Sequence, residues 1–86
     1  MSNFLVQHRW KGEDGEKVVG IVKGVIGMAK NSQLPSGFGL ESVNVVAGEN
    51  RALCAWNAPS ADALSDLIRQ VNPPTEWSVL EMNRMY

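Results

Sequence analysis

The sequence predicts a single small α+β domain, in which a four-stranded antiparallel sheet carries two helices on one face. Three observations lead to this fold class. Four short segments have the composition and alternation of strands, two longer segments have apolar residues at helical spacing, and the six follow one another in the order β-α-β-β-α-β. Short hairpins and right-handed crossovers leave one dominant arrangement for this order, the ferredoxin-like split with strand order 4-1-3-2.

Length and charge restrict the class of protein. One domain spanning residues 1–86 is expected, with eight basic and nine acidic residues and a formal net charge of −1. This balance argues against an extended nucleic-acid footprint or a basic membrane surface. The chain starts with no signal-peptide pattern, and no apolar run approaches the roughly 20 residues that cross a bilayer. We therefore expect a cytoplasmic protein without nucleic-acid or membrane partners.

The clearest local pattern lies between residues 52 and 71. Ala52–Ala58 has the length and apolar character of a strand, and Pro59 ends it because proline has no N–H to donate. Ser60 stands at the N-cap position of the next helix. Apolar residues then recur at i, i+3, i+4 and i+7, which defines one helix face: Leu64, Leu67, Ile68 and Val71. The helix is expected to stop at Asn72-Pro73-Pro74.

The other elements are weaker signals of the same kind. The first strand is predicted over Asn3–Trp10, the second over Phe38–Val46 and the last over Glu76–Met82. A helix is predicted from about Gly15 to Asn31, because its apolar residues form a stripe: Val18, Ile21, Val22, Val25, Met28 and Ala29.

Three glycines fall opposite that stripe, at Gly20, Gly24 and Gly27. Each costs about 1 kcal/mol relative to alanine in a helix interior. Two explanations stay open: close approach by another subunit or a ligand, or plain tolerance because tertiary packing stabilises the helix.

Strand alternation assigns the two faces of the sheet. The more apolar set is expected under the helices: Phe4, Val6, His8, Trp10, Val43, Val45, Cys54, Trp56, Leu80 and Met82. The opposite face also holds apolar groups, and a bare sheet face of this kind usually meets a partner. We expect a homodimer through it. Its candidate contact residues are Leu5, Gln7, Arg9, Leu53, Trp77, Val79 and Glu81, with Ser42, Asn44, Ala55 and Asn57 beside them.

His8 and Cys54 are the only histidine and the only cysteine, and alternation places both under the helices. Imidazole and thiolate are ligands for nickel, copper or zinc, so a divalent metal is one candidate occupant. Two ligands do not make a site, and the spacings CxxC and HExxH are absent. The alternative is a buried cysteine that acts as a small apolar residue beside a hydrogen-bonded histidine.

The same four residues, His8, Trp10, Cys54 and Trp56, also form a candidate ligand pocket. Aromatic walls with one titratable group suit a binding cleft, and a histidine can act as a general base. The alternative is a core built from aromatic side chains. On the other face, Arg9 and Glu81 are candidates for pairing across the first and last strands.

The chain resembles the dimeric α+β-barrel superfamily and, within it, a family of small ferredoxin-like domains of unknown function in bacteria and archaea. Four runs carry the resemblance: Phe4-Leu5-Val6, Leu34-Pro35-Ser36-Gly37, Cys54-Ala55-Trp56-Asn57-Ala58-Pro59-Ser60 and Ser78-Val79-Leu80-Glu81-Met82. The resemblance implies the fold and a homodimer. Some relatives are associated with nickel, and the superfamily includes small monooxygenases, isomerases and haem-linked enzymes. Their catalytic patterns are not recognisable here, so no activity follows.

Three functions remain open at this point. The first is a small binding protein that holds a small ligand or a divalent metal between sheet and helices. The second is a cofactor-free enzyme of the monooxygenase or isomerase type, with His8 as the acid or base. The third is a structural or regulatory dimer without a ligand. Phosphate chemistry is not expected, because the glycines match neither GxxxxGK[ST] nor GxGxxG.

Overall fold

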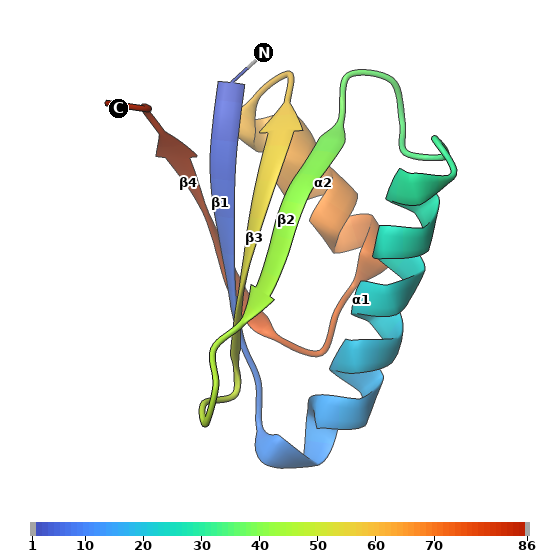
Figure 1. Ribbon diagram of the computed structural model, residues 1–86, viewed down its shortest axis with the longest axis vertical. Coiled ribbons are helices and arrows are strands. Elements are labelled where there is room, and N and C mark those ends of the chain that lie inside the picture. Colours follow the sequence, from blue (N-terminus) through green and yellow to red (C-terminus); the bar gives the residue numbers. More distant parts are fainter. Residues whose placement is uncertain (1, 86) are drawn as a thin grey trace.

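The computed structural model describes residues 2–85 and confirms the predicted fold (Figure 1). Its strands are β1 (Ser2–Arg9), β2 (Gly39–Val45), β3 (Arg51–Ala58) and β4 (Glu76–Met82), and its helices are α1 (Gly15–Lys30) and α2 (Ala61–Val71), with a short 3-10 turn, η1 (Gly12–Asp14), before α1. The strands form one antiparallel sheet of order β2-β3-β1-β4, equivalent to the predicted 4-1-3-2. Over residues 2–85, no helix is both long and apolar enough to cross a membrane.

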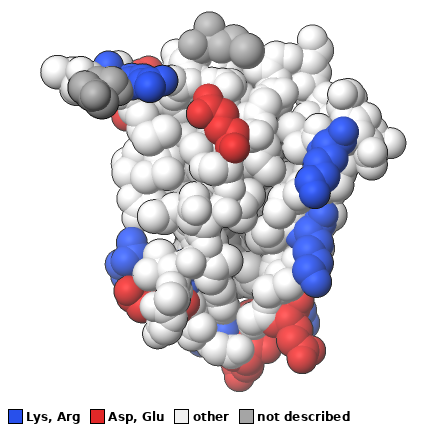
Figure 2. All heavy atoms as spheres, viewed as in Figure 1, with Lys and Arg blue, Asp and Glu red and all other residues white. Residues whose placement is uncertain are grey.

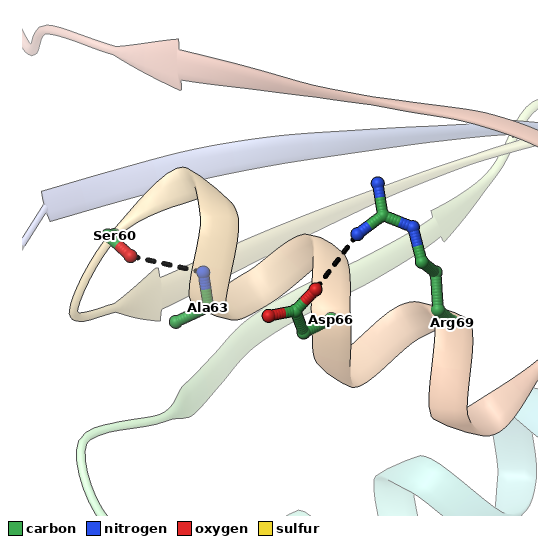
Figure 3. A network of polar contacts seen from close by, with 4 residues as sticks. All are labelled: Ser60, Ala63, Asp66 and Arg69. Atoms are coloured by element: carbon green, nitrogen blue, oxygen red, sulfur yellow. Dashed lines mark hydrogen bonds and ion pairs between the residues drawn. The ribbon is translucent and has the colours of Figure 1, made fainter.

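Helix α2 starts and ends at the residues that the local pattern predicted. The Ser60 hydroxyl accepts a hydrogen bond of 3.0 Å from the Ala63 backbone N–H, which satisfies one free donor of the first turn (Figure 3). In the last turn of α2, the Arg69 guanidinium donates to the Asp66 carboxylate over 2.9 Å on the exposed side of the helix. Asn72 closes the helix in the left-handed conformation, with φ of 51°.

The core lies between the two central strands and α2, which passes behind β2 and β3 in the view of Figure 1. Phe4 and Val6 of β1 stand directly opposite Trp56 and Cys54 of β3, so the four side chains share the helix-facing side of the sheet. The cluster of buried core residues consists of Phe4, Val6, Cys54, Trp56, Ala58, Leu64 and Ile68. Val43 and Val45 of β2 stand opposite Cys54 and Ala52, so the predicted faces are confirmed for β2, for β3 and for β1 as far as Arg9.

Helix α1 is attached more loosely than α2. It lies toward the β2 edge of the sheet, and Val18 is its one buried residue (Figure 1). Gly20, Gly24 and Gly27 face away from the sheet, and a Cβ built on any of them would meet no atom within 4 Å. Nothing in the described chain approaches these glycines closely, so no contact within the protomer explains them.

Strand β4 presents the opposite face from the one predicted. Its register pairs Trp77 with His8, Val79 with Val6 and Glu81 with Phe4, which puts all three β4 residues on the helix-facing side. Leu80 and Met82 lie on the open face instead. The prediction was wrong because apolar residues occur at both parities of this strand, so alternation alone could not choose.

The proposed pairing of Arg9 with Glu81 fails for the same reason. The residue opposite Arg9 is Glu76, at the far end of β4 from Glu81. Arg9 is on the open face and Glu81 on the helix-facing side, so no rotation of the side chains brings the two together.

Candidate functional site

A cavity of about 80 Å³ lies between the sheet and the two helices. Side chains from α1, β1, β2, β3 and α2 meet around it, together with the segment that follows α2. Almost all of them are apolar, among them Val22, Val25, Leu40, Trp56, Leu67 and Ile68. The apolar stripe of α1 lines this space, and Val25 of the stripe also packs against the core cluster.

One end of the cavity is polar. His8 Nδ1 and Thr75 Oγ1 are 2.9 Å apart and share a hydrogen bond, and both residues line the cavity. Burial lowers the pKa of the His8 imidazole, because removal from water disfavours its charged form. A neutral imidazole has one nitrogen that donates and one that accepts, and Thr75 occupies Nδ1. The wall thus offers an uncharged hydrogen-bonding pair.

Cys54 contributes a thiol to the same wall. Burial raises its pKa to about 11, so the group is protonated at neutral pH. The thiolate is the form that attacks electrophiles and ligates metals. Cys54 therefore behaves as a small apolar side chain in this cavity.

The structure brings together three of the four predicted pocket residues: His8, Cys54 and Trp56. Trp10 lies outside the cavity, contrary to the prediction. Strand β1 ends at Arg9, and the Trp10 backbone N–H donates to the Asn50 carbonyl over 3.1 Å. Trp10 lines a separate surface groove.

The residues present do not fit a divalent metal. His8 stands opposite Ala52, two positions along β3 from Cys54, so the two candidate ligands are diagonal neighbours. Among residues 2–85, no group of three or more histidine, cysteine, aspartate or glutamate side chains is placed to hold a metal ion. Two candidate ligands are fewer than the three or four protein donors that hold a divalent metal in typical sites.

The sequence did not predict that Thr75 and the apolar residues of α1 line the same cavity. Thr75 is 67 positions from His8 in the chain, and the sequence around Thr75 predicted only that the preceding helix ends there. The register of β1 on β4 is what brings Thr75 beside the histidine. The apolar stripe of α1 was visible in the sequence, but it predicted a packed core rather than a hollow.

Comparisons with protein-family models, with characterised proteins and with solved structures found no significant match. The resemblance proposed from the sequence is therefore supported only as far as the fold, a ferredoxin-like βαββαβ domain.

Proposed function

We propose that the protein binds a small, mainly apolar molecule in the cavity between the sheet and the helices. The cavity itself is the observation that carries this proposal. Ligand sites in proteins are typically apolar hollows with a few placed polar groups, and this one has apolar walls with His8 and Thr75 at one end. We favour binding over catalysis because burial keeps the Cys54 thiol protonated, and among the described residues the cavity lining places no carboxylate, amine or guanidinium beside the His8–Thr75 pair to share acid–base work.

The cavity volume limits the size of the part of a ligand that can enter. An engineered apolar cavity of roughly 150 Å³ in another protein binds benzene or xenon. The present cavity, at about 80 Å³, is about half as large and so suits a group of about three carbon atoms. A larger group would need α1 to move outward, and that helix has a single residue in the buried core.

Xenon provides the direct test of the cavity. Under xenon pressure, we expect the methyl NMR signals of Val22 and Val25 to shift, while that of Leu80 on the open face does not. Ala52 is buried and lines the cavity, so Ala52→Val should fill part of it and abolish the shifts. The same change should raise the free energy of unfolding by about 1 kcal/mol, since it buries two more methyl groups.

Ala55→Val is the matched control, because it adds the same atoms to the open face of the same strand. It should leave the xenon shifts as they are in the wild type. The proposal is wrong if xenon moves no cavity methyl signal, or if Ala52→Val leaves the shifts unchanged.

A second proposal concerns the open face of the sheet, which we infer joins two copies of the chain. Leu5 and Leu53 are half-buried on this face, and Leu80, opposite Leu5 on the edge strand β4, is 45% exposed. In the view of Figure 2 the surface over the strands is largely uncharged, and most charged side chains lie toward its edges. A sheet face on which Leu5, Leu53 and Leu80 stand among uncharged polar side chains suits self-association through identical surfaces.

Light scattering tests the dimer. At high micromolar concentration we expect twice the chain mass of 9.4 kDa. Leu80→Lys should return the mass to that of a monomer, because it would place two charges in the interface. Val45→Lys is the control, since Val45 is 60% exposed but belongs to the helix-facing side of β2. A wild-type mass of one chain would contradict the dimer.

A further inference from the structure

Two hollows of different character meet at one short segment. Pro73 and Thr75, between α2 and β4, line the apolar cavity on one side. The same two residues line an open surface groove on the other side, where Trp10 also lies. The strap formed by residues 73–75 is therefore a wall that the cavity and the groove share.

Few interactions hold the strap. Pro73 and Pro74 have no N–H and cannot donate to the backbone. The Thr75 N–H donates to the Pro73 carbonyl within the strap over 2.8 Å. The Thr75 side chain bonds to His8 Nδ1 over 2.9 Å, which ties the strap to β1. The His8–Thr75 hydrogen bond therefore lies in the wall that the groove and the cavity share.

The groove is polar where the cavity is apolar. Its wall holds the Trp10 indole and charged side chains of both signs: Arg9, Lys11, Glu13, Asp14 and Glu76. A head group with a single charge would lie near like charges as well as opposite ones. An uncharged group that donates and accepts hydrogen bonds avoids this repulsion and still finds partners.

We propose that the ligand is a small amphiphile with one uncharged polar end. Its apolar tail occupies the cavity, its polar head lies in the groove beside Trp10, and it crosses the strap at Pro73 and Thr75. The uncharged His8–Thr75 pair supplies hydrogen-bonding partners at the crossing. This inference rests on the proposed function, because it assigns the tail to the same cavity.

1-Butanol and 1,4-butanediol form a matched pair of probes. We expect 1-butanol to shift the methyl signals of Val22 and Val25 and the indole N–H signal of Trp10, with the same apparent Kd for all three. The diol would bury a second hydroxyl without a partner in the apolar end, so it should bind at least about fivefold more weakly. Equal binding of the two compounds would overturn the inference.

Trp10→Ala separates the inference from the proposed function. It should weaken 1-butanol binding at least about threefold and leave the xenon shifts of the cavity methyl groups unchanged, and Trp10→Phe should restore most of the affinity. If 1-butanol moves the cavity signals but neither shifts Trp10 nor responds to Trp10→Ala, the inference is wrong and the cavity proposal stands. If neither xenon nor 1-butanol moves the cavity signals, both are wrong.

Discussion

Phe4→Ala is expected to lower the free energy of unfolding by about 3–5 kcal/mol. Phe4 is 2% exposed and stands on the central strand opposite Trp56, within the cluster that α2 covers. Its removal loses buried apolar surface and leaves a void that the paired strands cannot close. Small domains are stable by about 5–15 kcal/mol in total, so this variant should be close to unfolded at physiological temperature.

Urea denaturation followed by circular dichroism measures the loss. Leu80→Ala is the control, because Leu80 is a large apolar residue on the open face, and at concentrations below self-association its change should stay within about 0.5 kcal/mol. Equal losses in the two variants would contradict the assignment of the core to the helix-facing side.

Replacing Gly20, Gly24 and Gly27 together by alanine is expected to raise the free energy of unfolding by about 2–3 kcal/mol. Each glycine lies inside α1, where alanine has the better helix propensity, and each new methyl group would meet no atom within 4 Å. For a domain of this size, the gain corresponds to an increase in Tm of roughly 10–20 °C.

Thermal unfolding of the triple variant provides the measurement, and Gly37→Ala provides the opposite control. Gly37 has φ of 89°, and a Cβ there would lie 3.1 Å from Pro59 Cγ, so alanine should be destabilising at this site. An unchanged or lower Tm in the triple variant would refute the prediction. If the Tm rises as expected but light scattering gives the mass of a single chain, the glycines form a contact between copies.

The parts of the fold that are encoded locally could be predicted from the sequence. Pro59 ends β3, and the Ser60 cap starts α2 directly after it. The apolar stripe that includes Leu64 then runs along α2. The order of elements then left one topology, which the structure confirms. These signals suffice because capping, proline geometry and helical periodicity depend on neighbours in the chain.

The features that failed depend on partners distant in the sequence. Strand β4 has apolar side chains at both parities, and only its register on β1 decides that Val79 faces the helices and Leu80 does not. Trp10 lies beyond the end of β1, and the contact of His8 with Thr75 follows from that same β1–β4 register. The presence of a cavity depends on how far α1 stands from the sheet, which no pattern in the chain records.

The weak attachment of α1 has a consequence for cooperativity. A helix with one buried residue can detach while the sheet and α2 stay folded, so opening of α1 is a local event with a lower free energy than global unfolding. Because the cavity wall includes the apolar stripe of α1, any occupant contacts the helix only when it is docked. Occupancy and docking are then linked equilibria: a bound molecule stabilises α1, and variants that stabilise the docked helix raise the affinity for that molecule.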